Sequence, residues 1–312
     1  MEPRLVIGFD GTDVPPRVAR LAADGALAGV VLFARNIASS EQLRALIRDL
    51  VACFPPGAPP LIAVDQEGGL VQRLKAPRIP EIAPIPPMRE LATRLDPAAT
   101  EALGAVMGAD LRAFGFNLDF APVLDVDTNP ANPIIGARAF GATPEHVTSH
   151  GLAFARGLAQ AGILACAKHF PGHGDTSLDS HTDRPRVSHD RDRLDAIELA
   201  PFKAAVDARI PMIMTAHVVY DALDPTTIAT TSPVIVRDLL RTRWGYDGLV
   251  ISDDLDMVAA QGLSPSEMAT ALTTAEVDLA LVGRDLDRAE ALARAFLPSP
   301  ATRRRLAAAL SS

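Results

Sequence analysis

The alternation of short apolar runs with longer helical segments constrains the fold of this chain more than any other feature. Each run is rich in β-branched residues, too short for a core helix, and typical of a buried parallel strand. Strands that alternate with helical patterns indicate βαβ units, and eight such units predict an α/β fold, a closed (β/α)8 barrel of the TIM type. The runs are Leu5–Phe9, Gly29–Phe33, Leu61–Val64, Asn117–Ala121, Ile163–Ala167, Pro211–Thr215, Gly248–Ile251 and Asp278–Val282.

The segments between these runs show helical spacing of Ala, Leu and Arg. They are Ala19–Ala26, Glu41–Ala52, Ala98–Phe114, Thr143–Ala161, Asp192–Asp207, Ser232–Arg243, Ser264–Ala275 and Leu286–Phe296. Two long connections, Lys75–Leu95 and Phe170–His189, lack apolar periodicity, and structureless loops of this length are uncommon unless they are functional. We therefore predict a single domain over residues 1–312, with a core at about 4–297 and a basic packing helix at Thr302–Leu310.

Composition and charge limit the classes of molecule that the protein could bind. Hydrophobic residues make up 48% and charged residues 22% of the chain, which favours a large core over disorder. A formal net charge of −8 disfavours nucleic acid and anionic membranes as partners. We expect no signal peptide and no membrane-spanning segment, since the sequence has neither a basic start followed by a long apolar run nor an apolar stretch of sufficient length, and we expect two cysteines to form neither a disulfide framework nor a zinc cluster. We expect a cytoplasmic monomer that needs no metal and no cofactor.

The densest polar signal follows the fifth apolar run. Residues 168–181, KHFPGHGDTSLDSH, hold three His, two Asp and one Lys. Pro171 and the glycines exclude a continuous helix, so His169 and His173 are not an i, i+4 metal pair. In an extended loop Asp179 and His181 point to the same side, and a carboxylate beside an imidazole is the arrangement of a general acid/base pair. The alternative is that these residues only hydrogen-bond a long loop in place.

A second signal is a pair of carboxylates after the seventh run, Asp253 and Asp254. Side chains alternate along a strand, so only one of the two faces the barrel axis. A carboxylate there can attack an anomeric carbon or stabilise an oxocarbenium ion. The alternative is that one of them caps the helix that follows.

A third signal is the segment 64–73, VDQEGGLVQR. Its two glycines let the backbone approach a ligand closely, Asp65 can accept sugar hydroxyls, and Arg73 can reach the same site. Arg138 is an isolated arginine in a loop, for which a surface salt bridge is the alternative.

These segments, with 32–37 (LFARNI), resemble the family 3 glycoside hydrolases, and most of all the bacterial cell-wall-recycling β-N-acetylglucosaminidases. The resemblance runs from about Val6 to Gly283 in the same order. It implies that Asp253 is the nucleophile of a covalent intermediate, that His181 is the acid/base, and that Asp179 is its partner. The positions implied to bind the sugar are Asp65, Arg73, Arg138, Lys168 and His169.

The resemblance also implies the substrate. Terminal β-linked GlcNAc would be removed, with net retention, from GlcNAc–1,6-anhydroMurNAc and its peptide-bearing forms, small carbohydrates from peptidoglycan turnover. The chain departs from the family at Leu70, where arginine is usual, which puts local loop packing or a charge network in doubt.

Four competing hypotheses remain open at the level of sequence. They are phosphorolysis at the same site, a metallohydrolase using His169, His173, His181 and Asp65, a Schiff-base lyase using Lys168, and a catalytically inactive sugar-binding barrel.

Overall fold

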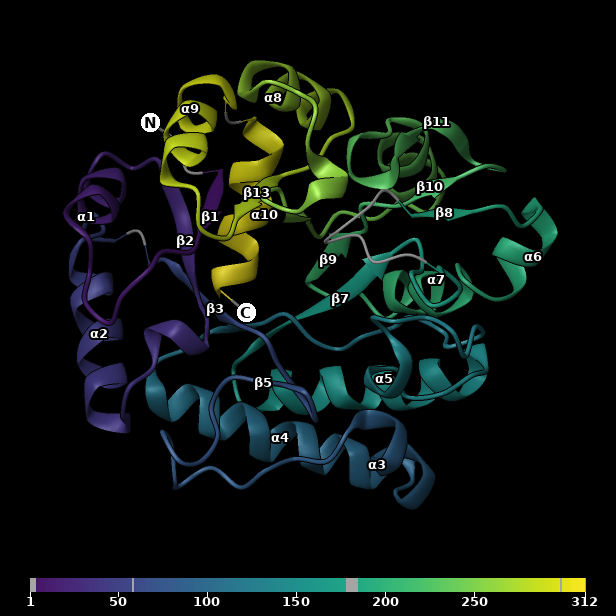
Figure 1. Ribbon diagram of the computed structural model, residues 1–312, viewed down its shortest axis with the longest axis horizontal. Coiled ribbons are helices and arrows are strands. Elements are labelled where there is room, and N and C mark those ends of the chain that lie inside the picture. Colours follow the sequence, from purple (N-terminus) through teal and green to yellow (C-terminus); the bar gives the residue numbers. More distant parts are fainter. Residues whose placement is uncertain (1–3, 58, 178–184, 298, 312) are drawn as a thin grey trace.

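The computed structural model of the chain describes residues 4–57, 59–177, 185–297 and 299–311. Eight parallel strands close into a barrel, and each pairs with the barrel strands before and after it in the chain (Figure 1). The strands are β1 (Leu5–Ile7), β2 (Leu27–Leu32), β3 (Leu61–Val64), β6 (Leu118–Asp119), β7 (Leu164–Phe170), β9 (Met212–Thr215), β12 (Leu249–Asp254) and β13 (Leu279–Val282). The predicted barrel is confirmed, and every predicted run contains or overlaps one of these strands.

An outer ring of helices covers the barrel because each helix has one apolar face. In α2, for example, the side chain of Ser39 caps the first turn by accepting from the Gln42 amide, and the buried residues are Leu43, Leu46, Ile47 and Leu50. Burying such a face against the sheet is what stabilises a helix of this length. The ring contains α1 (Pro16–Ala23), α2 (Ser40–Ala52), α4 (Pro97–Phe114), α5 (Pro144–Gln160), α7 (Ala200–Asp207), the π-helix η4 (Val234–Arg243), α8 (Pro265–Thr274) and α9 (Leu286–Ala295).

Two helical predictions need correction. The segment Asp192–Asp207 is not one helix but two, α6 (Arg191–Ala196) and α7, and Pro201 lies in the first turn of α7. Proline is tolerated there because the first amides of a helix have no intrahelical partner. The connection Lys75–Leu95 is not wholly irregular, because it contains α3 (Met88–Arg94).

Short elements decorate the carboxyl-terminal end of the barrel. A hairpin of β4 (Gln66–Gly68) and β5 (Val71–Gln72) follows β3, and a small sheet is formed by β8 (Arg186–Val187), β10 (Val219–Tyr220) and β11 (Asp224–Ile228). Single 3-10 turns are η1 (Ala34–Asn36), η2 (Gly136–Arg138), η3 (Ala229–Thr231) and η5 (Val258–Ala260).

Apolar side chains fill the inside of the barrel. The interior cluster consists of Val6, Ala28, Val31, Leu61, Ala63, Leu118, Phe120, Cys166, Met212, Met214, Leu249, Ile251, Leu279 and Leu281. Cys166 is a small buried side chain of this cluster. The barrel is a packed core and not a pore, which is the usual state of an eight-stranded parallel barrel.

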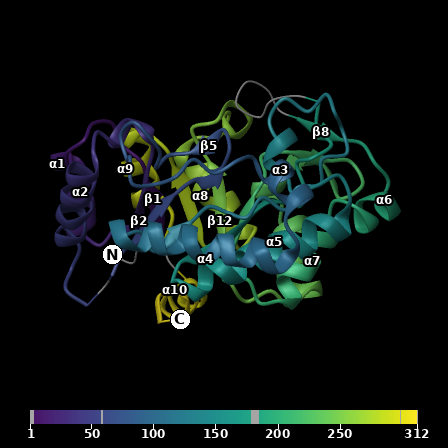
Figure 2. The ribbon, with the colours of Figure 1, turned by 90° about the horizontal axis from the view of Figure 1, so that it is seen from below.

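The predicted C-terminal helix is present as α10 (Pro300–Ser311), and it closes the amino-terminal end of the barrel. Leu306, Ala309 and Leu310 pack against the interior cluster. Figure 2 shows α10 at the opposite end of the molecule from β5 and β8. The helix is thus more than a solvated surface element.

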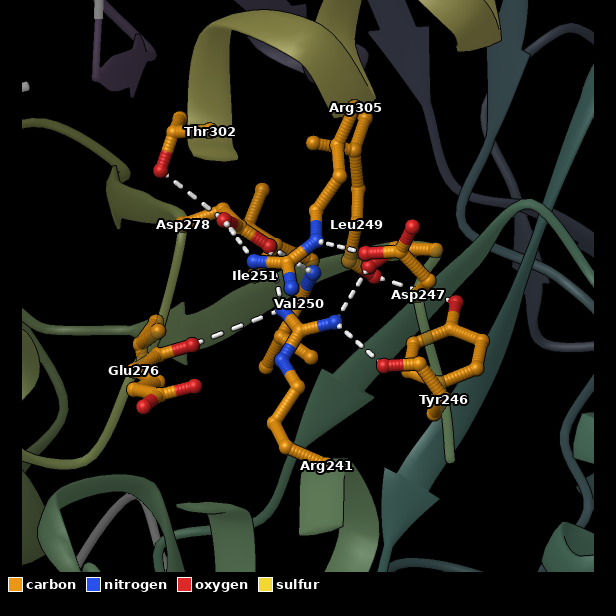
Figure 3. Close-up of polar contacts among 12 residues, drawn as sticks. Arg241, Tyr246, Asp247, Leu249, Val250, Ile251, Glu276, Asp278, Thr302 and Arg305 are labelled. Carbon is orange, nitrogen blue, oxygen red and sulfur yellow. Dashed lines mark hydrogen bonds and ion pairs between the residues drawn. The ribbon is translucent and has the colours of Figure 1, made fainter. Parts of the chain in front are cut away.

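A buried carboxylate fastens α10 to the barrel (Figure 3). Asp278 lies just before β13 and is 1% exposed. Its Oδ1 accepts from Thr302 Oγ1 at 2.8 Å and from Arg305 Nη1 at 3.1 Å, both in α10. Its Oδ2 accepts from the Val250 amide at 2.9 Å and from Arg241 of η4. One carboxylate therefore joins α10 to the starts of β12 and β13 and to η4 of the outer ring.

Within the described residues, no helix is both long enough and apolar enough to cross a lipid bilayer.

Candidate active site

A cavity of about 290 Å³ opens at the carboxyl-terminal ends of the barrel strands, and we call it the rim cavity. Such ends carry the active sites of barrel enzymes. Its floor is the top of the interior cluster, since Val31, Phe120, Met214 and Leu281 belong to both. Its other lining residues are Phe33, Asp65, Glu67, Val71, Arg73, Ile134, Arg138, Lys168, His169, His173, Asp253, Asp254 and Met257.

Lysine and arginine side chains meet two carboxylates on one wall of the rim cavity. Lys168 Nζ lies 2.8 Å from Asp65 Oδ1 and 2.6 Å from Glu67 Oε1. Arg138 makes a bidentate pair with Glu67, with both N–O distances 2.8 Å. Arg73 Nη2 is 3.5 Å from Asp65 Oδ2. The structure thus brings all five residues that the resemblance assigned to sugar binding to the rim cavity, four of them in this wall and His169 beside it.

Glu67 is the residue of this wall that sequence reasoning missed. Burial alone would raise the pKa of Glu67, but Arg138 and Lys168 outweigh it and hold that pKa well below its usual value. Desolvation opposes the charge of Lys168 as well, yet Asp65 and Glu67 raise the pKa of its amine above the ordinary value. The alternation of Asp65 and Glu67 after one strand, which places both on one face, was the available signal.

A further carboxylate, that of Asp125, fixes the orientation of His169. Asp125, which is 0% exposed, accepts from His169 Nδ1 at 2.7 Å and from the His169 amide at 3.1 Å. Burial would raise the pKa of Asp125, but His169 and His173 lower it below its usual value. An ionised carboxylate only accepts, so Nδ1 carries the ring proton, which fixes the tautomer and leaves Nε2 without that proton in neutral His169.

His173 lines the same cavity but stays neutral. Burial, with a smaller contribution from His169, lowers the pKa of His173 to about 4. Its Nδ1 is 2.7 Å from Thr176 Oγ1, and its amide donates to Asp125 at 2.7 Å. His173 therefore helps to build the start of the long loop after β7.

Asp253 reaches the rim cavity from β12. Its Oδ1 accepts from the amide of Asp254 at 2.8 Å. Desolvation in the cavity would raise the pKa of Asp253, but the nearby imidazoles of His169 and His217 and this amide lower it overall. The side chain is thus an ionised carboxylate at neutral pH, facing the same space as the wall formed by Asp65, Glu67, Lys168 and Arg138.

The alternative that Asp253 or Asp254 caps the following helix is wrong. The strand continues through Asp254, and α8 begins only at Pro265, with Ser264 as its capping residue. Asp254 instead accepts from the amides of Asp256 and Gly283. Asp179 and His181, predicted as the acid/base pair, lie outside the described residues.

One competing hypothesis loses support from this geometry, and another stays open. Among the residues that the structure describes, no group of three or more His, Cys, Asp or Glu side chains is placed to hold a metal ion, but His181 of the metallohydrolase hypothesis lies outside them. A Schiff-base lysine must lose its proton, but the two carboxylates against Lys168 stabilise its ammonium form.

A closed parallel barrel with an ionised carboxylate facing a wall of charged side chains at its carboxyl-terminal rim suits a glycoside hydrolase. Comparison with known proteins gives the family. The model of the glycosyl hydrolase family 3 N-terminal domain matches residues 13–296, and the chain belongs to that family. The predicted resemblance is confirmed.

Individual relatives agree with this assignment. A β-hexosaminidase of Alkalilimnicola ehrlichii is 39% identical over 95% of this chain and 84% of its own length. β-Hexosaminidase A of Pseudoalteromonas piscicida is 36% identical over 87% of this chain, but the match spans only 48% of that longer protein. The crystal structure of NagZ from Neisseria gonorrhoeae with N-trifluoroacetyl-D-glucosamine superposes with a TM-score of 0.88 at 32% identity, over 99% of this chain and 90% of that one.

Proposed function

We propose that this protein is a retaining, exo-acting β-N-acetylglucosaminidase. The observation that carries the proposal is the ionised carboxylate of Asp253, which shares a cavity of monosaccharide size with a wall of fixed charged groups. The names of the relatives support it, since they are β-hexosaminidases, and so does the glucosamine derivative bound by the Neisseria protein.

The wall opposite Asp253 would hold the sugar. Asp65 would accept hydrogen bonds from sugar hydroxyls. Arg73, Arg138 and Lys168 would donate hydrogen bonds to hydroxyl or acetamido oxygens. The ring of His169 is held in a fixed orientation, and its Nε2 would accept a hydrogen bond from the sugar. Because the ion pairs already fix these side chains, little conformational entropy is lost when the sugar binds. The wall therefore provides orientation as well as affinity.

The reaction would be a double displacement. Asp253 attacks the anomeric carbon and forms a glycosyl ester while His181 protonates the departing oxygen, with Asp179 stabilising the imidazolium. Water then cleaves the ester, His181 takes the proton of that water, and Asp253 leaves as the free carboxylate. Two inversions give net retention of the anomeric configuration.

The substrate would be terminal β-linked GlcNAc in GlcNAc–1,6-anhydroMurNAc and its peptide-bearing forms, and the enzyme would act in the cytoplasm as a single-domain monomer. The motifs shared with cell-wall-recycling enzymes support this choice. A cavity near the lower end of the usual range for small-molecule sites, about 300–1,000 Å³, suits one sugar unit.

The test is hydrolysis of p-nitrophenyl glycosides of GlcNAc, GalNAc and glucose, with NMR of the first product anomer. We expect β-GlcNAc as the first product from the first substrate and none after Asp253→Asn, with Asp247→Asn, an exposed aspartate at the other end of the barrel, as the matched control. Release of an inverted anomer would refute the mechanism, and a rate that requires added phosphate would assign phosphorolysis instead.

The role of His181 has its own test. His181→Ala should slow aryl glycosides with poor leaving groups most, because good leaving groups need little protonation. Equal losses across a series of leaving groups would remove His181 from the acid role.

A further inference from the structure

Asp254, the neighbour of the proposed nucleophile, joins the ends of two barrel strands. Its Oδ1 accepts from the amide of Gly283 at 2.8 Å, just after β13, and from the amide of Asp256 at 3.0 Å. β12 and β13 pair with a register shift between Ile251 and Asp254, so the regular ladder is interrupted at this end. Within the shift the Leu281 amide donates to Ser252 Oγ at 2.9 Å, and the carboxylate of Asp254 adds the bond to Gly283 at the point where β12 enters the rim.

The backbone of Asp254 is held as firmly as its side chain. Its carbonyl oxygen lies 3.0 Å from Nε2 of His217, which follows β9, and the other ring nitrogen of His217 lies 2.7 Å from Thr230 Oγ1. His217 is 0% exposed. Asp254 is therefore tied to strands on both sides of β12.

These ties act directly on Asp253. The amide of Asp254 donates to Asp253 Oδ1 at 2.8 Å, so the rotation of the peptide between the two residues sets where the Asp253 carboxylate points. The same hydrogen bond stabilises the ionised form of Asp253. We call the contacts of Asp254 with Gly283, Asp256 and His217 its anchor. A change in the anchor would thus change both the position of the Asp253 carboxylate and the stabilisation of its ionised form.

Close packing leaves the anchor no room to shift. A Cβ atom at residue 283 would lie 2.0 Å from Asp254 Oδ2 and 2.8 Å from its Cγ. Glycine at 283 is therefore required for the present contact, and alanine there would displace the carboxylate without removing it.

We propose that Asp254 is a positioning residue for catalysis, whose carboxylate fastens β12 to β13 and so holds the peptide that aims the Asp253 carboxylate at the anomeric carbon. This rests on the proposed function of Asp253 as nucleophile. Asp254 does not itself bond to the sugar in this scheme.

The electrostatic setting gives the anchor a pH dependence. Burial raises the pKa of Asp254 to about 6. The amides of Asp256 and Gly283 act in the opposite direction, and repulsion from the carboxylates of Asp256 and Asp253 adds to the rise. The other charged or titratable groups near it are Arg35 of η1, which attracts the carboxylate, and His217 at its carbonyl. Protonation below pH 6 weakens an acceptor of two amides, so the anchor loosens on the acid side.

The experiment compares Asp254→Ala with Asp256→Ala. Asp256 is a matched control because its Oδ2 also accepts two amides after β13, Arg284 at 2.8 Å and Asp285 at 2.9 Å, yet it is not part of the cavity lining. We expect Asp254→Ala to lower kcat for p-nitrophenyl β-GlcNAc by about 100-fold with KM nearly unchanged, the cost of a nucleophile misplaced by an ångström or so. Asp256→Ala should keep kcat close to wild type.

Two further variants separate positioning from general loss of structure. Gly283→Ala should reproduce the fall in kcat with the carboxylate still present. Asp254→Asn is neutral at every pH and mimics the protonated carboxyl, so its kcat at pH 7 should already be lowered to the value that the wild type approaches below pH 6, and the acid limb near pH 6 should be absent. The folded fraction of each variant is measured by near-UV circular dichroism, and kcat is taken per folded molecule.

Azide distinguishes Asp254 from the nucleophile. Azide can replace a missing carboxylate at the anomeric carbon, so it should restore turnover to Asp253→Ala as the α-glycosyl azide and should not restore Asp254→Ala. Equal kcat in the Asp254→Ala and Asp256→Ala variants, or an acid limb unchanged in Asp254→Asn, would overturn the proposal. A wild-type protein that hydrolyses no GlcNAc glycoside would instead refute the proposed function.

Discussion

Replacing Asp278 by asparagine should destabilise the fold without harming the rim cavity. The carboxylate of Asp278 accepts from four groups, two on each oxygen. An asparagine offers one oxygen, so its NH₂ group must face two of these donors. The hydroxyl of Thr302 can rotate to accept, but the NH₂ group faces an arginine donor on either side, and both Arg241 and Arg305 lose the charge of residue 278.

The magnitude follows from burial. The side chains of Arg241 and Arg305 are 4% and 11% exposed, and that of Asp278 is 2% exposed. Breaking a buried ion pair by removing one partner costs about 3–5 kcal/mol in unfolding free energy. For 312 residues, with an unfolding entropy of about 2.1 cal/mol/K per residue, this corresponds to a fall in Tm of about 5–8 °C.

Asp247→Asn is the matched control for this measurement. Asp247 binds the same Arg305, with Nε at 2.8 Å, but its side chain is 65% exposed. An exposed pair contributes only about 0–1 kcal/mol. Urea unfolding and thermal scans of both variants measure the difference, and activity per folded molecule should equal that of wild type in both. Equal destabilisation by the two substitutions would refute the reasoning from burial.

Further expectations concern the wall and the hairpin at the rim. Glu67→Gln leaves Arg138 and Lys168 without a shared anion, and should cost about 3 kcal/mol of unfolding free energy and raise KM, measured by urea unfolding and steady-state kinetics. The pKa values of Glu67, Asp125 and Asp253 are lowered in the folded protein, so the unfolded chain takes up more protons on acidification. These three groups therefore stabilise the fold above their ordinary pKa of about 4 and lose that contribution as the pH falls below it; urea titrations from pH 7 to pH 3 should show the loss, and Glu67→Gln should flatten it. Leu70→Arg should change stability by less than about 0.5 kcal/mol, because the Leu70 side chain is 85% exposed; a large loss in a thermal scan would show a packing role.

The barrel could be predicted from sequence because its signals are local. Apolar runs of four or five residues and a polar residue at the end of each need no knowledge of long-range contacts. The rim residues Asp65, Lys168 and Asp253 followed from the same rule, since the ends of parallel strands meet on one face. Leu70, a departure from the family pattern, proves to be 85% exposed.

What could not be predicted depends on partners that are remote in the chain. Glu67 gains its role from Arg138, which is 71 residues away, and nothing in its own segment marks that pairing. Pro201 was the one sequence signal of the break between α6 and α7. The residues on either side of it have helical spacing, so the segment looked like a single helix. The anchoring of α10 depends on Asp278, whose position before the last strand resembles that of any loop aspartate.

The filled barrel has a consequence for how a ligand can enter and leave. Since the floor of the rim cavity is formed by the same side chains that pack the interior, the described residues leave no passage through the barrel. A molecule bound beside Asp253 would have to enter and leave by the same opening at the carboxyl-terminal rim. In the proposed reaction the released alcohol and the sugar would both depart through that opening.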